Sequence, residues 1–537
     1  MPVQPTYPGV YVTEIPSGVR TITGVATSIT AFIGRALSGP VDEPVIINSF
    51  ADYERAFGGL WGPSTMSYAV RDFYLNGGSQ AVIVRIFNDP DPEIQFDDTT
   101  AKLQLPTGVA GPPNDELVLT AVSPGAWGND LSASVNYKTQ DPTKPPGSPI
   151  GSPTTFNLIL SVKGVKAEQF LNVSLDPASV NFLPRVLAQT SGLVAVPKDK
   201  ATGEWILPSA IPEVTLTDAL AAGGSDGLDL TPDQYMGGDK GQLEKKGLYA
   251  LEKTDLFNLL CIPPATREGN TDISIYNAAM GYCVSRRAVL IVDSPIEWGV
   301  NSQPANTAHD QLGSLNLNGE NARNAALYFP RILAADPLRK NQVSTFVPSG
   351  MVAGIMARTD TNRGVWKSPA GIDASLNGIQ GLQTKLTDAE NGQLNPVGIN
   401  CLRTFPLSGS VVWGARTLRG ADQLADDYKY LAVRRTALFI EESLYRGTQW
   451  VVFEPNDAPL WAQIRLNIGA FMHNLFRQGA FQGSTPKDAY LVKCDSETTT
   501  QNDINLGIVN ILVGFAPLKP AEFVIIQIQQ LAGQIDT

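Results

Sequence analysis

The sequence is poor in the residues that build metal and nucleotide sites. Only two histidines, His309 and His473, occur among 537 residues, and the four cysteines form no CxxC pair. A catalytic zinc site needs several such ligands at close spacing, so this chain has nothing to build one from. The nucleotide-binding pattern GxxxxGK[ST] is also missing. We therefore expect no metal, no cofactor and no catalytic residues.

Long apolar runs and an excess of positive charge are missing as well. The first basic residue is Arg20 and no apolar run follows Met1, so we expect no signal peptide. The late apolar stretch 504–518 is interrupted by two asparagines and a proline, which predicts a buried strand rather than a membrane span. A net charge of −12 argues against nucleic acid as the main ligand. The sequence favours a protein made in the cytoplasm that neither enters membranes nor binds nucleic acid directly.

The order of strand and helix patterns predicts a chain of several domains. A length of 537 residues exceeds what one core buries. Strands and helices alternate in two blocks, which predicts a mostly parallel sheet covered on both faces, and a β-rich stretch separates the blocks. The fold class is α/β within a mixed α+β chain. The predicted regions are an N-terminal extended arm (1–20), the first part of an αβα sheet core (21–92), an inserted mostly β domain (93–246), the second part of the core (247–394), an α+β C-terminal domain (395–520) and a C-terminal arm strand and tail (521–537).

Several elements have clear local signals. Ser49 precedes a helix that should end at Gly58-Gly59, because serine accepts hydrogen bonds from free N–H groups at a helix start. A second helix is predicted over 64–75, and residues 81–84 form a buried strand. In the last third, helices are predicted over 427–446 and 459–477.

Each end of the chain carries one extended apolar segment. Side chains alternate between two sides in both segments, as in a strand. A lone strand exposes unpaired backbone groups and is not stable by itself, so each needs a partner strand in this chain's own sheet or in another chain. The two segments comprise Val10, Tyr11, Val12, Thr13 and Ile15 at the start, and Phe523, Val524, Ile525, Ile526 and Ile528 at the end.

One motif matches a catalytic pattern. Residues 223–227 fit GxSxG around Ser225, and Asp293 and His309 follow in the order found in α/β-hydrolases. A nucleophile elbow needs a buried strand before the serine and a helix after it, and the flanking residues predict neither. The pattern favours a glycine-rich connector and no enzymatic activity. A hydrolase that uses Ser225 is the alternative.

A basic cluster occupies residues 403–435. One interpretation is a solvated face with local ion pairs, such as Arg434 or Arg435 with Glu441 or Glu442. The other is a basic surface for an acidic protein partner. The sequence favours the first. The basic residues are Arg403, Arg416, Arg419, Lys429, Arg434 and Arg435.

Several long runs resemble the tail sheath proteins of contractile bacteriophages and of related phage-tail-like injection particles. They cover both chain ends and most of 247–531, in the family's order, and the likeness is weak across 93–246. Residues 407–410 and 418–427 fit less closely. The runs are YPGVYVTEIPSG, ITGVATSITAFIGRALSGP, VPSGMVAGIMARTDTNRGVWKSPAG, LNPVGINCLRTFPLSGSVVWGARTL, VRRTALFIEESLYRGTQWVVFEPNDAPLW and GFAPLKPAEFVIIQI.

The resemblance implies a mechanical role in a virion tail or a phage-tail-like particle. Members of this family stack as six-subunit rings around an inner tube, between a baseplate and a terminal cap. The sheath is assembled in a metastable extended state, and its contraction drives the tube through a target envelope. The resemblance also implies that both chain ends pair with neighbouring subunits. Another shell-forming protein, such as a capsid or tail-tube subunit, is the alternative within structural proteins.

The resemblance further implies that the C-terminal domain faces the tube. The candidate tube-facing residues are Arg465, Arg477, Arg434 and Arg435.

Overall fold

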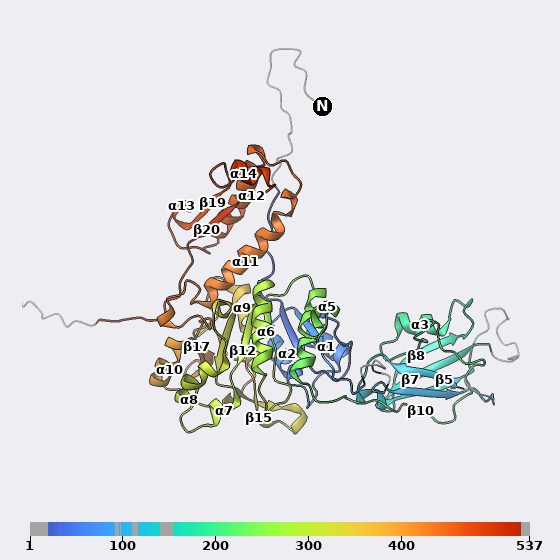
Figure 1. Ribbon diagram of the computed structural model, residues 1–537. Helices are drawn as coiled ribbons and strands as arrows, with labels where there is room; N and C mark the ends of the chain where they lie inside the picture. The colour runs from blue at the N-terminus through green and yellow to red at the C-terminus, as the bar shows by residue number, and fades with distance from the viewer. Residues whose placement is uncertain (1–19, 92–95, 97, 110–115, 140–153, 528–537) are drawn as a thin grey trace, which may run out of the picture.

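The computed structural model describes residues 20–91, 96, 98–109, 116–139 and 154–527. They form a central α/β body, a β-rich domain beside it, and a C-terminal region connected to the body through the long helix α11 (Leu431–Gly447) (Figure 1). The predicted α/β class within a mixed, multi-domain chain is therefore confirmed. Among the described helices, none combines the length and apolar character that a membrane crossing needs.

The body is built on an eight-stranded sheet of order β18-β17-β13-β12-β11-β1-β3-β2. The six inner strands are parallel, and an antiparallel strand closes each edge. Continuous apolar runs form these inner strands because helices cover both faces. The strands are β1 (Thr30–Gly34), β2 (Val45–Ile47), β3 (Ala81–Arg85), β11 (Leu259–Cys261), β12 (Val289–Asp293), β13 (Ala325–Phe329), β17 (Ile399–Phe405) and β18 (Gly409–Val412).

Two apolar cores lie on the two faces of this sheet. In β1, Phe32 belongs to one core, and its neighbours Ala31 and Ile33 belong to the other. This alternation is what a strand buried on both faces requires. Helices α1 (Phe50–Phe57), α2 (Thr65–Leu75) and α9 (Ser349–Arg363) pack on the Phe32 side. The opposite core includes residues of α4 (Pro232–Met236), α6 (Ile273–Ser285), α7 (Ile296–Val300), α8 (Pro304–Gln311) and α10 (Asp388–Leu394).

The local signals in the first block agree with the structure. The Ser49 hydroxyl accepts a hydrogen bond from the Asp52 N–H at 3.1 Å, and α1 ends at Gly58, whose φ is 82°. Glycine adopts this left-handed conformation without a Cβ clash, so it stops the helix there. A small antiparallel sheet and a short helix complete the body: β14 (Ile332–Asp336), β15 (Gln342–Phe346), β16 (Gly381–Leu382) and α5 (Gly241–Glu244).

The inserted domain consists of two antiparallel sheets around one apolar core. Its entry and exit segments run together: the Ser225 N–H donates to the Thr99 carbonyl at 3.0 Å, and the Leu228 N–H donates to the Asn88 carbonyl at 2.9 Å. Its elements are β4 (Lys102–Pro106), β5 (Glu116–Ala121), β6 (Leu131–Asn136), β7 (Phe156–Val162), β8 (Val165–Val173), α3 (Leu183–Thr190), β9 (Val194–Ala195) and β10 (Ala219–Leu220).

The end of the insertion lies earlier than the predicted residue 246. Tyr235, in α4, is 4% exposed and packs in the core of the central body together with Leu248 and Phe257. Because one large buried aromatic fixes this helix to the body, residues 232–246 belong with the body rather than with the insertion.

The C-terminal region begins later than the predicted residue 395. Strand β17 pairs in parallel with β13 and so extends the body's sheet. The separate region starts with α11, and of the predicted buried strand in 504–518 only Leu512–Phe515 is a strand, half exposed. Its remaining elements are α12 (Ala458–Arg477), α13 (Pro486–Ala489), β19 (Tyr490–Lys493), α14 (Gln501–Asn505) and β20 (Leu512–Phe515).

Candidate functional site

The GxSxG residues lie apart from the two residues expected to complete a triad. Ser225 is in the exit segment of the insertion, and its hydroxyl accepts from the Gly227 N–H at 3.3 Å. Asp293 is buried at the end of β12 and accepts from the Ser349 N–H at 2.9 Å, while exposed His309 lies 3.1 Å from the Asp310 carboxylate. All three residues are described, and no hydrogen bond joins any two of them. The motif is a connector in this fold, and within the described residues no cluster suited to a metal ion occurs.

Every basic residue of the 403–435 cluster pairs with a carboxylate of the same chain. The local ion-pair interpretation therefore holds, but Arg435 pairs with Asp360 instead of Glu441 or Glu442. Paired charges attract a further acidic partner weakly. The pairs are Arg403–Asp388, Arg416–Asp422, Arg416–Glu522, Arg419–Asp426, Lys429–Asp422, Arg434–Glu441 and Arg435–Asp360.

The C-terminal arm leaves the body at a buried ion pair. Arg416 is fully buried, and its Nε and Nη2 atoms contact the two Glu522 carboxylate oxygens at 2.8 and 2.6 Å. The Tyr430 hydroxyl adds a third contact to Glu522 at 3.3 Å. Burial disfavours the charge of Arg416, but the carboxylates of Glu522 and Asp422 raise its pKa above the ordinary value. This bidentate geometry fixes where the arm begins.

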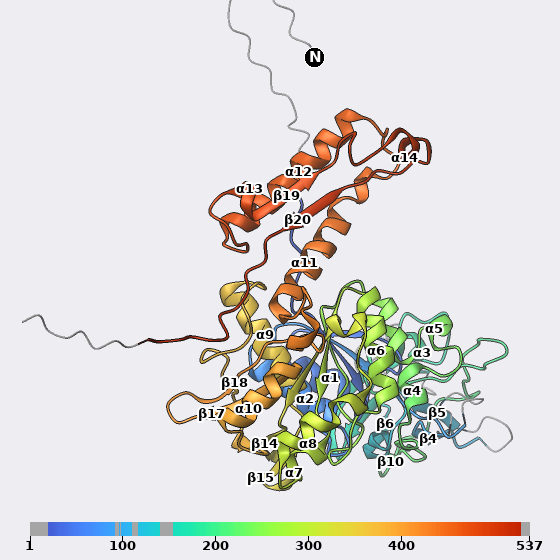
Figure 2. The same cartoon turned by 60° about the vertical axis from the view of Figure 1, so that its left-hand side comes forward.

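From Phe523 to Gln527, the last described residue, the arm forms no strand with its own subunit. Phe523, Val524, Ile525 and Ile526 are between 74% and 84% exposed, and residues 521–527 have no assigned secondary structure. Both views show this segment running away from the body (Figures 1 and 2). The alternative that the arm joins this chain's own sheet is therefore wrong for its described part. The predicted N-terminal strand residues 10–15, and Ile528, lie outside the described residues.

The N-terminal arm is rooted in the C-terminal region. The Arg20 N–H donates to Asn467 Oδ1 at 3.2 Å, and its guanidinium lies 4.7 Å above the Trp450 ring. Ile22 is buried in the C-terminal core, and the Val25 N–H donates to Ser443 Oγ at 3.2 Å. The segment that follows the arm is therefore fixed to the C-terminal region and to α11 before it enters β1.

A buried ion pair joins this segment to α11 and to the body. Arg435 Nη1 contacts Asp360 Oδ1 at 2.9 Å, and both side chains are at most 5% exposed. The Thr27 hydroxyl donates to Asp360 Oδ2 at 2.6 Å, and Arg435 also donates to the Thr27 carbonyl at 2.9 Å. Burial raises the pKa of Asp360, and the Arg435 charge opposes that shift.

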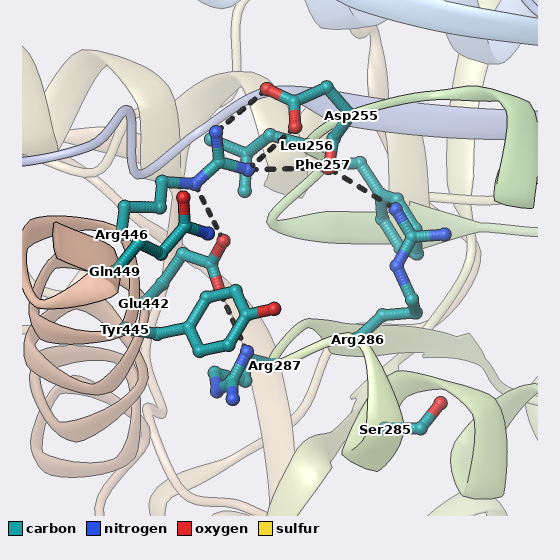
Figure 3. A pocket seen from close by; sticks show the side chains of 10 residues that line it. All are labelled: Asp255, Leu256, Phe257, Ser285, Arg286, Arg287, Glu442, Tyr445, Arg446 and Gln449. Atoms are coloured by element: carbon teal, nitrogen blue, oxygen red, sulfur yellow. Dashed lines mark hydrogen bonds and ion pairs between the residues drawn. The ribbon is translucent and has the colours of Figure 1, made fainter. Parts of the chain in front are cut away.

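A second group of ion pairs connects the far end of α11 to the body (Figure 3). Arg446 bonds Asp255 at 2.7 Å and Glu442 at 2.8 Å, and Glu442 also pairs with Arg287 at 2.9 Å. Hydrogen bonds from Arg446 hold the pKa of Asp255 below its ordinary value. These residues line an open hollow of about 650 Å³. Most of these residues are partly exposed, and exposed ion pairs contribute little to stability.

The C-terminal region presents a sheet of two strands with open edges. β19 and β20 pair over four residues, from Tyr490–Phe515 to Lys493–Leu512. Among the described residues, no other segment forms backbone hydrogen bonds along the outer edges of Leu491–Lys493 or Leu512–Phe515. A two-stranded sheet of this kind can accept a further strand on either side.

The four arginines predicted to face a tube have different surroundings. Arg435 is buried, and Arg434 contacts Glu441 at 3.3 Å and Asn324 at 3.1 Å. Arg465 is half-buried and donates to the Cys494 carbonyl. Arg477 lies exposed in the last turn of α12 and has no ion pair with any other described residue. Only Arg477 offers an exposed, unpaired charge.

Two family models match consecutive parts of the chain. The phage tail sheath protein central domain matches residues 232–418, and the phage tail sheath C-terminal domain matches residues 424–530. Together these matches cover more than half of the chain. The first begins at α4, where the structure places the end of the insertion.

Curated proteins and solved structures show the same likeness. The tail sheath protein of Burkholderia phage BcepMu is 24% identical over 497 residues, covering 88% of this chain and 87% of that protein. The sheath of an extracellular contractile injection system, PVC, solved in the contracted state, is 21% identical with a TM-score of 0.57, covering 98% of both chains. The sheath tail protein Lin1278 from Listeria innocua is 14% identical with a TM-score of 0.57, covering 93% of this chain and 96% of that chain. These solved structures share the fold of this chain.

Proposed function

The chain belongs to the contractile tail sheath family and is a structural sheath subunit, and we propose that it polymerises as stacked six-subunit rings around an inner tube. The sheath would assemble in the bacterial cytoplasm between a baseplate and a terminal cap, in a metastable extended state. Contraction would then drive the tube through a target envelope. In this proposal Ser225 has no catalytic role.

The exposed C-terminal arm is the observation that carries the proposal. Four consecutive apolar residues, 523–526, extend into solvent beyond a buried anchor at Glu522. A soluble monomer rarely exposes such a run, because it adds apolar surface and free backbone groups without a partner. A strand that is fixed at one end and bare along its length is suited to pair with another subunit.

The two-stranded sheet β19–β20 of a neighbouring subunit is the acceptor that we propose for the arms. No other described segment pairs with its outer edges, and an isolated pair of strands gains stability when strands are added. The C-terminal arm of one subunit and residues 10–15 of another would extend it to four strands. The 19 residues before Arg20 can span up to roughly 65 Å when extended, which allows subunits to remain linked while their bodies move.

Such links are consistent with a sheath that stores free energy in the contacts between its subunits. The extended sheath would be a kinetic trap between two arrangements of the same subunits, which differ by about a few kcal/mol per subunit. Backbone pairing through the arms would hold the subunits together while the contacts between bodies change. The sum over many rings would supply the work, so no nucleotide is required.

Removal of residues 1–19 tests this proposal. Arg20 is retained because its backbone and guanidinium contact Asn467 and Trp450. The truncated subunit should keep the wild-type melting temperature but form no cylinders in electron microscopy. Deletion of residues 1–5 alone, which leaves the predicted strand intact, is the matched control and should assemble normally. Contractile cylinders from the longer truncation would contradict the role of the arm.

We also propose that Arg477 contacts the tube. Its exposed charge is unpaired among the described residues, whereas the other three candidate arginines already have partners within the subunit. Arg477→Glu should weaken co-assembly with the tube protein and its dependence on salt, while the sheath still forms empty cylinders. Lys166→Glu, an exposed charge reversal in the insertion, is the control. Normal tube-filled sheath from Arg477→Glu would exclude this contact.

A further inference from the structure

The loop between α11 and α12 holds an aromatic side chain fully in solvent. Phe453 is 102% exposed, and its neighbour Val452 is 63% exposed. Phe453 also has a φ of 71°, the left-handed region that bulky side chains rarely adopt. Single exposed apolar residues are common on protein surfaces, so exposure by itself says little. An exposed aromatic on a strained backbone is less common and suggests that the position serves a contact.

Hydrogen bonds on both sides make this loop rigid. Before Phe453, the Val451 N–H donates to the Thr448 carbonyl at 2.9 Å. After it, the Asn456 side chain donates to the Ile508 carbonyl at 2.9 Å and accepts from Trp461 Nε1 at 2.8 Å. Phe453 is therefore presented on a fixed support, and binding would order little additional chain.

The same loop lies at the root of the N-terminal arm. Trp450, three residues before Phe453, stacks on Arg20, the first described residue. In the proposed assembly the 19 residues before Arg20 cross to a neighbouring subunit. The proposed link between the two subunits therefore begins beside the loop that carries Phe453. Ile508, 43% exposed and bonded to the loop through Asn456, adds apolar area beside it.

We propose that Phe453, with Val452, is an anchor that packs into a second copy of this chain in the assembled sheath. This inference rests on the proposed function. Phe453 supplies the rigid aromatic contact that often dominates the energy of an interface, and the strand pairing of the arms supplies the backbone link. In the separate subunit the side chain is completely exposed, so its removal should not affect folding.

The test compares Phe453→Ala with Leu407→Ala, which removes another fully exposed apolar side chain, from the β17–β18 turn. Both variants should keep the melting temperature of the wild-type subunit. Leu407→Ala should form cylinders at the wild-type protein concentration, whereas Phe453→Ala should need roughly tenfold more protein or fail to assemble. Assembly of Phe453→Ala at the wild-type concentration would overturn the inference.

A photo-crosslinking amino acid at position 453 gives a second readout that does not depend on the alanine variant. In assembled wild-type-like cylinders it should produce crosslinked dimers of this chain. Crosslinks confined to single subunits would overturn the inference. Failure of the wild-type protein itself to form cylinders would instead contradict the proposed function, so the two failures are distinguishable.

Discussion

The eight-stranded sheet of the body and the two-stranded sheet of the C-terminal region differ in how their edges are covered. The outer edge of β18 in the body is covered by residues 371–376, with hydrogen bonds of 2.9 Å from the Gly371 N–H to the Val412 carbonyl and 3.0 Å from the Val412 N–H to the Ala374 carbonyl. The other edge strand, β2, has only three residues. The described outer edges of β19 and β20 have no such cover. The chain therefore covers or shortens the edges of its body sheet, and the described edges of its C-terminal sheet have no partner strand.

The largest difference should appear when one phenylalanine is removed from each region. Phe32 is fully buried in β1, with its ring 5.6 Å from the ring of Phe73, whereas Phe523 in the arm is 74% exposed. Phe32→Ala should lower the free energy of unfolding of the body by about 3–5 kcal/mol, because it leaves a cavity. Phe523→Ala should leave this energy unchanged and weaken cylinder formation. Urea unfolding and electron microscopy measure the two effects.

The opposite outcome would remove the contrast between the regions. If Phe523→Ala destabilised the isolated subunit as much as Phe32→Ala, the arm would be part of the subunit's own core. If it changed neither stability nor assembly, the exposed apolar run would have no role in pairing.

A smaller change in the free energy of unfolding should come from a titrating carboxyl group inside the body. Burial raises the pKa of Asp293 to about 6, although the Ser349 hydrogen bond and the Arg331 charge oppose that shift. Because the folded state binds this proton more tightly than the unfolded state, the contribution of Asp293 to stability falls as pH rises from about 4 to 6. The loss is on the order of 3 kcal/mol and is complete above that range.

Asp293→Asn should therefore be more stable than the wild type at pH 7 and nearly equal to it at pH 4. Asparagine keeps an oxygen that can accept from the Ser349 N–H. Urea unfolding of both proteins at the two pH values isolates this group, since the other titrations cancel in the difference. A stability gain that does not change with pH would exclude titration of Asp293 as its cause.

The smallest effect should come from the anchor of the C-terminal arm. Glu522→Gln removes a charge that faces fully buried Arg416, but leaves Arg416 paired with Asp422. We expect the free energy of unfolding to fall by about 1–2 kcal/mol, measured by urea unfolding. Phe523→Ala lies next to the anchor and should leave this energy unchanged. An unchanged free energy of unfolding in Glu522→Gln would mean that the ion pair does not fix the arm.

The parts of the fold that were predictable depend on near neighbours in the sequence. The Ser49 cap, the Gly58 stop and the helix at 459–477 follow from residues a few positions apart, and the structure has each of them within one residue. The region boundaries near 246 and 395 were misplaced, because they depend on Tyr235 packing on the body and on β17 pairing with β13. No local pattern reports such distant contacts.

The candidate site also has some features that the local sequence predicts and others that depend on distant contacts. Alternating apolar residues identified the exposed run at 523–526, but Arg416 and Glu522 are separated by 106 positions, and nothing in the sequence indicates that they pair. Similarly, the sequence alone does not show that Arg435 and Arg477 have different surroundings. Only the fold shows that Asp360 neutralises the first and that the second is exposed.

Because the entry and exit segments of the inserted domain lie side by side, this subunit is suited to carry a foreign domain in place of the insertion. Backbone hydrogen bonds join Asn88 to Leu228 and Thr99 to Ser225. The inserted domain therefore begins and ends at nearly the same point on the body. A foreign domain whose termini lie similarly close together could replace it without displacing β3 or α4, the body elements that flank it. In a sheath of stacked rings, one such graft would be repeated along the whole cylinder, and a weakly binding module would gain avidity from that repetition.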